Sequence, residues 1–243
     1  MLKIEKFEVV GWEPAIRGMR NPMNSWEKSD SGYCVQDLSR DCNNCVHNHT
    51  NYPTCHCGGF DIGPNDYTLM KKLRKAGTDH RKFMRMIIVY LDITAPLYWW
   101  KEFDTYKVGT VANSCSTMHK IHAKEFTLED FSTEHFHKRT SMNFGEIINE
   151  LNYWRDIYLN GGLVDDYNGK ARIYEKKDKN AWDQMIQLLP SSYNQKRTVM
   201  LNYEVLANIY ESRKNHKLDC WHTFCHWIDE LPYSELITGY EEE

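Results

Sequence analysis

A cluster of cysteines and histidines is the densest group of metal-binding side chains in the sequence. Cys42 and Cys45 form one close pair, Cys55 and Cys57 form a second, and histidines stand among them. Structural zinc is held by four such ligands in a tetrahedron, and two close pairs joined by a short loop can supply them. The spacing predicts a structural zinc ion, because four thiolates leave no open position for catalysis. The alternative is a loop whose cysteines are incidental.

Two further groups are weaker candidates for chemistry. His222 and His226 have the i, i+4 spacing of a helical metal pair, but Trp221 beside them favours the edge of a hydrophobic core. Cys115 precedes Ser116 and could act as a nucleophile, whereas a small buried thiol is the commoner role of such a cysteine. The sequence has no glycine-rich dinucleotide loop, no phosphate-binding loop and no helical zinc-protease motif.

A third group is spaced along a predicted helix near the C-terminal end. Asn202, Asn208 and Arg213 follow a Leu-Pro turn at Pro190. Asn202 and Arg213 are eleven positions apart, close to three helical turns, so the pattern places them on one face. A planar guanidinium suits a bidentate grip on phosphate. These residues are compatible with a ligand site, but from the residues alone a helix whose polar ends are only capped and solvated is the commoner case.

The third group resembles the flavin-dependent thymidylate synthases. That family has a Leu-Pro turn, then a helix with one Asn, a second Asn six residues on and an Arg five residues further, and all these spacings are kept here. The resemblance implies that Asn202 and Asn208 contact a flavin and that Arg213 reaches a uridylate. Glu204 stands where the family has an Arg, which alters one flavin contact.

A second segment, residues 95–121, carries the same resemblance. It begins with Ala-Pro after a predicted strand, and Asn113 and Ser116 match a loop that holds the nucleotide in the family. The resemblance implies that Ser116 and Arg213 form the catalytic site on the nucleotide. Lys107, Asn113 and His119 complete the substrate site, and Lys107 also joins the two asparagines at the cofactor.

The resemblance is broken at three motifs. Thr105-Tyr106-Lys107 replaces an Arg-His-Arg motif and keeps one positive charge, and Met118-His119 stands where an Arg follows the serine. Residues 76–83, AGTDHRKF, replace a His-Glu-Thr-Pro-Phe-like turn that contacts flavin in the family. A Thr-Tyr-Lys run cannot supply two fixed guanidinium groups, so His119, Lys107 and Lys120 would have to replace part of that charge.

The resemblance implies an enzyme that methylates dUMP to dTMP with methylenetetrahydrofolate and FAD, with each site shared among the subunits of a homotetramer. The flavin and the reduced folate would carry the reaction, and the protein would orient the reactants. The broken motifs favour an alternative, a nucleotide-binding or sequestering protein on the same fold, such as a phage could encode. A purely structural oligomer is a third possibility.

The elements expected around these residues are mostly helices, which favours the α+β class. The resemblance implies helices packed on a central, mostly antiparallel sheet. The periodicity predicts one strand at 83–94 and helices at 65–76, 97–106, 142–159, 180–189, 198–217 and 221–231. Thr127 and Asp130 resemble a helix cap. Residues 1–25 read as an extended start followed by turns, 26–66 as a long ordered insert, and 161–177 as a loop.

Length and charge limit the class of protein. The 243 residues suit a single domain, 1–243, with the Cys/His-rich insert at about 34–60. A formal net charge of −4 argues against polymeric nucleic acid as a partner. No apolar run is long enough for a membrane helix, and the start of the chain has no signal-peptide core. We therefore expect a cytoplasmic protein with reduced cysteines.

Overall fold

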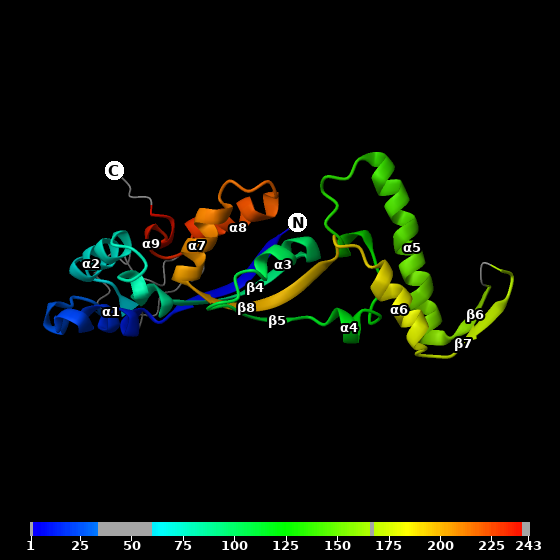
Figure 1. Cartoon of the computed structure of the whole chain (residues 1–243), viewed down its shortest axis with the longest axis horizontal. Coiled ribbons are helices and arrows are strands. Elements are labelled where there is room, and N and C mark those ends of the chain that lie inside the picture. The colour runs from blue at the N-terminus through cyan, green and yellow to red at the C-terminus, as the bar shows by residue number, and fades with distance from the viewer. Residues whose placement is uncertain (1, 34–59, 166–167, 240–243) are drawn as a thin grey trace, which may run out of the picture. The chain divides into compact units, whose positions relative to one another are not determined.

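The computed structural model describes residues 2–33, 60–165 and 168–239, which are drawn in colour in Figure 1. The described chain forms two compact units. Unit 1 comprises residues 1–3, 93–105 and 113–198, and unit 2 comprises residues 4–92, 106–112 and 199–243. The predicted zinc ligands Cys42, Cys45, Cys55 and Cys57 lie outside the described residues.

A four-stranded antiparallel sheet contributes strands to both units. Its order is β1 (Lys3–Val10), β4 (Ile88–Pro96), β8 (Asn194–Asn202) and β5 (Val111–Ser114). The two inner strands, β4 and β8, are rich in β-branched and large apolar residues, and their inward side chains are buried. The predicted class is confirmed, because helices accompany a central antiparallel sheet.

Unit 2 is built around helix α7 (Tyr203–Arg213), whose Leu206 and Ile209 are fully buried. This helix packs on the 3-10 helix η4 (Arg81–Arg85), on α8 (Asp219–Asp229) and on α9 (Glu235–Thr238). Helices α1 (Trp12–Arg20) and α2 (Pro64–Lys75) also contact η4. A short strand pair, β2 (Gly32–Tyr33) with β3 (Phe60–Asp61), and two 3-10 turns, η1 (Asn21–Met23) and η2 (Trp26–Lys28), complete the unit.

Unit 1 has its own hydrophobic core between α5 (Lys138–Asn160) and α6 (Lys179–Leu188). Phe131, Phe144, Leu151 and Met185 are buried in this core. The hairpin of β6 (Gly162–Asp165) and β7 (Ala171–Tyr174) follows α5. Helix α3 (Leu97–Phe103), the short α4 (Thr117–Lys120) and the turn η5 (Leu128–Asp130) supply the remaining elements.

Several predicted helices are confirmed with small changes of boundary. These are α2, α3, α5, α6 and α8, and α5 ends at the expected Gly161. Thr127 and Asp130 form the expected reciprocal cap, although it begins a short 3-10 turn. Among the described residues, none of the helices is long and apolar enough to cross a membrane.

Four predictions about secondary structure were wrong. Residues 12–20 form helix α1 rather than turns, because Pro14 lies in the first turn, where its missing N–H costs nothing. Residues 83–85 belong to η4, so strand β4 starts only at Ile88. The expected loop at 161–177 contains the β6–β7 hairpin. Residues 198–202 form the end of strand β8 rather than the start of a helix.

Candidate functional site

Asn202 caps the N-terminal end of α7. Its backbone is extended, and its Oδ1 accepts a hydrogen bond of 3.0 Å from the backbone N–H of Val205. The side chain is buried, and an added Cβ at Gly109 would lie only 2.9 Å from Asn202 Nδ2. The prediction that Asn202 and Arg213 share one helical face was therefore wrong, because Asn202 precedes the helix. Its oxygen is committed to the fold.

Glu204, in the first turn of α7, is a buried carboxylate that binds two arginines of η4. Arg85 donates from Nε to Oε2 at 2.6 Å, and Arg81 donates from Nε to Oε1 at 3.4 Å. The carboxylate raises the pKa of the Arg85 guanidinium by hydrogen bonding and by its charge. Glu204 and Arg81 lie at positions where the sequence departs from the pattern of the flavin enzymes, and Arg85 follows shortly after. The two departures are thus joined in one ion-pair cluster that links η4 to α7.

Asn208 lies one turn further along α7 and is exposed. Its Oδ1 accepts a hydrogen bond of 3.2 Å from Arg81 Nη2. An amide whose oxygen is held in this way directs its two N–H donors to other acceptors, such as the carbonyl edge of a planar ring. Of the two predicted flavin residues, Asn208 has the geometry of a ligand contact and Asn202 has that of a helix cap.

Arg213 ends α7 with its guanidinium set against two aromatic rings. Its Nε donates to the Tyr106 hydroxyl at 2.9 Å. The guanidinium carbon lies 4.7 Å from the centre of the Trp221 ring and 5.6 Å from the centre of the Tyr106 ring. Lys107, which follows Tyr106 in the sequence, is exposed. A guanidinium and a phenol therefore meet at this end of α7, and the cationic Lys107 follows the phenol in the sequence, a combination that suits an anionic group.

The other predicted substrate residues belong to unit 1. Ser116 is the N-cap of α4, and its Oγ accepts a hydrogen bond of 3.0 Å from the backbone N–H of His119. Asn113, on β5, and His119 are exposed. The expectation of a buried thiol at Cys115 was wrong, because this cysteine is exposed.

The predicted site residues are thus divided between the two units. Lys107, Asn202, Asn208 and Arg213 belong to unit 2, with the first and last near Tyr106, whereas Asn113, Ser116 and His119 belong to unit 1. The encounter of Arg213 with Ser116 remains a prediction.

No group of three or more metal-binding side chains gathers among the described residues. His222 and His226 are largely exposed, and each faces an acidic side chain of its own helix, Asp219 at 4.0 Å and Glu230 at 3.7 Å. This pair therefore gives no support for a metal site. The zinc predicted at Cys42, Cys45, Cys55 and Cys57 stays a prediction outside the described residues.

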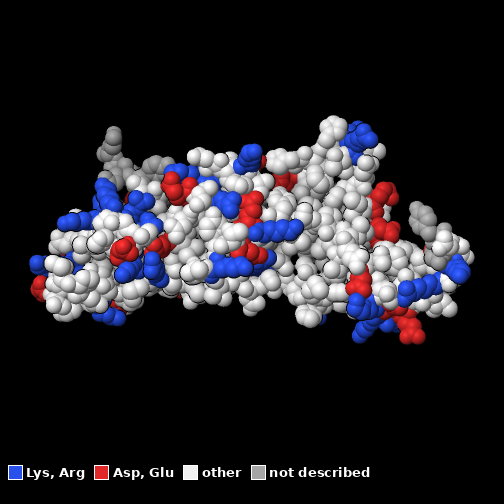
Figure 2. Space-filling model, in the orientation of Figure 1, with Lys and Arg blue, Asp and Glu red and all other residues white. Residues whose placement is uncertain are grey.

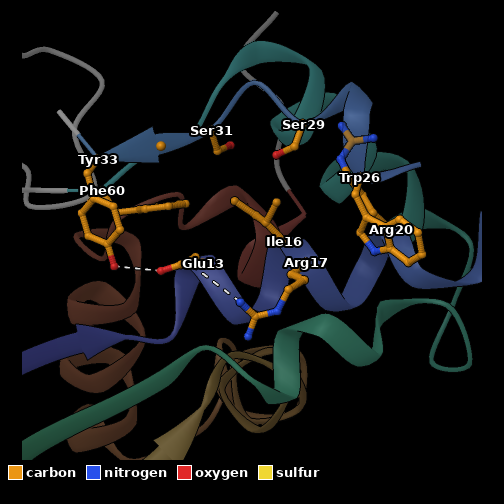
Figure 3. Close-up of a pocket in the computed structure, with 10 residues that line it drawn as sticks. Glu13, Ile16, Arg17, Arg20, Trp26, Ser29, Ser31, Tyr33 and Phe60 are labelled. Carbon is orange, nitrogen blue, oxygen red and sulfur yellow. Dashed lines mark hydrogen bonds and ion pairs between the residues drawn. The ribbon is translucent and has the colours of Figure 1, made fainter. Parts of the chain in front are cut away.

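A hollow of about 280 Å³ in unit 2 was not expected from the sequence (Figure 3). Tyr33 donates its hydroxyl proton to Glu13 at 2.8 Å on one side, and Trp26 lies on the other. Behind the hollow, the fully buried Asp66 accepts hydrogen bonds from Arg20 Nε at 2.6 Å and from the hydroxyls of Ser29 and Ser31. These polar groups satisfy one another, so they hold the loop in place.

Comparisons with known proteins by sequence and by structure give different results. By sequence, no family model matches the chain, and neither does any curated protein. By structure, the chain resembles thymidylate synthase X (ThyX) from Helicobacter pylori with FAD and dUMP, with a TM-score of 0.59 and 12% identity over 98% of each chain. A second structure of that enzyme, also complexed with FAD and dUMP, gives 0.57 and 13% over 99% of each chain.

The chain has the fold of a flavin-dependent thymidylate synthase. The likeness covers nearly the whole chain and so includes the elements of both units. It confirms the resemblance at the level of the ThyX fold. At 12% identity the likeness assigns no role to a single residue, and the roles of Arg213, Asn208 and Ser116 must rest on their own geometry.

Proposed function

We propose that this ThyX-like protein is a nucleotide enzyme that binds dUMP and FAD and methylates dUMP to dTMP with methylenetetrahydrofolate. The observation that carries the proposal is the match of fold, over 98% of both chains, with a protein whose structure contains FAD and dUMP. A fold alone hosts many functions, so the residues at the two ends of α7 supply the chemical support.

The nucleotide phosphate would bind at the C-terminal end of α7. Arg213 is held between Tyr106 and Trp221, and its guanidinium suits the paired oxygens of a phosphate. The exposed Lys107 would add a second positive charge. Basic and acidic side chains are interspersed on the face shown in Figure 2, so a small anion would be bound by individual residues rather than by a broad positive surface.

Ser116, Asn113 and His119 of unit 1 are the other residues that we propose to bind the nucleotide. Ser116 is partly exposed, and the Asn113 amide and the His119 ring are exposed to solvent. A hydroxyl, an amide and an imidazole can hydrogen-bond to a pyrimidine or to a sugar. Arg213 and Ser116 are the two residues that we propose to act on the reacting nucleotide.

The flavin would bind at the N-terminal end of α7. Asn208 fits this role, because it is exposed and Arg81 orients its amide. Asn202 fits less well, because its oxygen caps the helix and Gly109 covers its nitrogen. When bound, FAD supplies a hydride and the reduced folate supplies the one-carbon unit. The chain's own contribution is to bind and orient them, with Lys107 serving both ligands.

A second candidate is a nucleotide-binding or sequestering protein without flavin chemistry. The Glu204 cluster favours it, because the buried carboxylate of Glu204 and its partner Arg81 stand at positions where the resemblance to the flavin enzymes is broken. We also propose that the protein assembles as a homotetramer, because the resemblance implies active sites that are shared among four subunits.

Two measurements on purified protein separate these candidates. The absorption spectrum after incubation with FAD and gel filtration reports whether oxidised flavin is retained. Calorimetric titration with dUMP reports nucleotide binding. We expect both flavin and dUMP to bind. Binding of dUMP without flavin would support the second candidate, and binding of neither would overturn the proposal.

A further inference from the structure

The environment of Arg213 is built from three separate parts of unit 2. Tyr106 comes from the segment after α3, Arg213 ends α7, and Trp221 lies in the first turns of α8. The two rings approach each other edge to face, with 6.2 Å between their centres and an angle of 72°. Arg213 therefore lies at the junction of two helices and a loop.

Trp221 is a rigid support for the guanidinium. The indole is fully buried, and it packs edge to face on Phe224 with 5.9 Å between ring centres. A fully buried indole in close-packed surroundings has little rotational freedom. A guanidinium whose carbon lies 4.7 Å from the centre of this ring gains a cation–π attraction.

Tyr106 fixes the remaining rotation of the side chain. Its hydroxyl oxygen accepts from Arg213 Nε at 2.9 Å, within the range of a normal hydrogen bond. An arginine loses considerable rotamer freedom when it binds a ligand, and a side chain that is already held loses less. A phosphate would meet the guanidinium along an edge with two parallel N–H donors, the geometry of a bidentate contact.

We propose that Tyr106 is a positioning residue, which holds the Arg213 guanidinium in the orientation that receives the phosphate of the nucleotide. This inference rests on the proposed nucleotide binding and adds a role to a residue that stands within a degenerate motif. Tyr106 carries no charge itself, but it orients the charged side chain of Arg213, which lies over a hundred positions away in the sequence.

The test is calorimetric titration of the full chain with dUMP and with deoxyuridine, which has no phosphate. Tyr106→Phe keeps the ring and removes only the hydroxyl acceptor. It should weaken dUMP binding about three- to tenfold, the usual effect of one lost hydrogen bond, and leave deoxyuridine binding unchanged. In an Arg213→Ala background the same change should have no further effect on dUMP, because the two residues act together.

Tyr203→Phe is the matched control. Tyr203 is fully buried in the same unit and donates its hydroxyl proton to the carbonyl of Pro232 at 2.6 Å. Its loss should lower the melting temperature without changing the affinity for dUMP.

The outcomes separate the inference from the proposed function. If the wild type binds dUMP and Tyr106→Phe binds it equally well, or loses deoxyuridine to the same extent, the positioning role is overturned and the proposed function stands. Independent, additive effects of Tyr106→Phe and Arg213→Ala would also overturn it. If the wild type itself binds no dUMP, the proposed function is overturned, and the inference is overturned with it.

Discussion

The two ends of helix α7 hold their charged side chains in different ways. At the N-terminal end, Glu204 is buried and its charge is consumed by Arg81 and Arg85. At the C-terminal end, Arg213 keeps its expected identity and lies against the rings of Tyr106 and Trp221. One end holds a structural ion-pair cluster, and the other holds a cation against two aromatic rings, where we propose that an anion binds.

The difference shows that a buried carboxylate and an arginine that binds a ligand need different surroundings. A buried charge must find partners, so a carboxylate at position 204 is tolerated only with cations nearby, and η4 supplies two. A binding arginine has a different requirement, because its value depends on orientation. Aromatic rings and a hydroxyl can provide that without adding charge.

The comparison predicts its largest effect on stability at Glu204. Glu204→Gln removes the charge that Arg81 and Arg85 share and leaves both guanidinium groups without their carboxylate. We expect the free energy of unfolding to fall by about 3 kcal/mol, at the low end for a buried pair because Arg85 is half exposed. Urea denaturation measures this change.

The controls for Glu204 lie on the same helix. Glu211 is exposed, pairs with Lys214 and interacts at longer range with Arg74, so Glu211→Gln should change stability by less than about 0.5 kcal/mol. The reversed pair, Glu204→Arg with Arg85→Glu, should recover only part of the lost stability, because the new arginine pairs with the new carboxylate but is repelled by Arg81. Equal stability of Glu204→Gln and wild type would show that the cluster has no structural role.

Asp66 offers a second buried carboxylate for calibration, far from the predicted ligand residues in sequence. Burial alone would raise the pKa of Asp66, but hydrogen bonds from Ser31, Ser29 and Arg20 outweigh it and hold the pKa below the usual value. A lowered pKa means that this group stabilises the fold above its unfolded pKa and loses that contribution as the pH falls through its folded pKa.

Asp66→Asn should therefore lower the free energy of unfolding at neutral pH by about 2 kcal/mol, because charge-assisted hydrogen bonds are weakened. The difference from wild type should shrink in acid, where the wild-type carboxylate is protonated. Denaturation curves at several pH values measure it. If the difference in the free energy of unfolding does not change with pH, the charge of the carboxylate does not explain the stabilisation.

The smallest predicted effect on stability is at Asn202, whose side-chain oxygen caps helix α7. Asn202→Ala should lower the free energy of unfolding by about 1 kcal/mol, and Asn202→Ser, which keeps a cap oxygen, should lower it less. FAD retention by the Ser variant sharpens the comparison. Loss of FAD without loss of stability would return Asn202 to the cofactor site.

The confirmed helices are those with local signals. Helix α2 begins at Pro64, and α5 ends at Gly161, whose positive φ of 75° suits glycine. Such boundaries depend on residues within one or two turns, so a single sequence is enough to predict them.

The wrong elements have different physical causes. Residues 198–202 are a short apolar run, and its length cannot distinguish a buried strand from the start of a helix. The β6–β7 hairpin leaves Leu163 and Ile173 exposed, so its strands lack the alternation of buried and polar residues. Asn168-Gly169 between the strands, with Gly169 at positive φ, was the available hairpin signal.

Only part of the candidate site could be predicted, namely the residues whose intervals along the sequence formed a pattern. Asn208 and Arg213 could be selected from the intervals along one helix, and the structure gives both an orienting partner. The partners themselves, Arg81 and Tyr106, lie more than one hundred positions away in the sequence, and no local pattern links them to α7. Zinc at Cys42, Cys45, Cys55 and Cys57 is still a prediction, which metal analysis of the purified protein tests.

The most direct test of the central claim compares Arg213→Ala with Glu204→Gln in one titration with dUMP, beside their denaturation curves. We predict that Arg213→Ala weakens dUMP binding by about 2 to 4 kcal/mol, the effect of truncating one partner of a charge pair, and leaves folding nearly intact. Arg213→Lys should recover part of the affinity, because a point charge lacks bidentate geometry. Glu204→Gln should lower stability far more than affinity. Wild-type affinity for dUMP in Arg213→Ala would contradict the account and make Arg213 a structural cation.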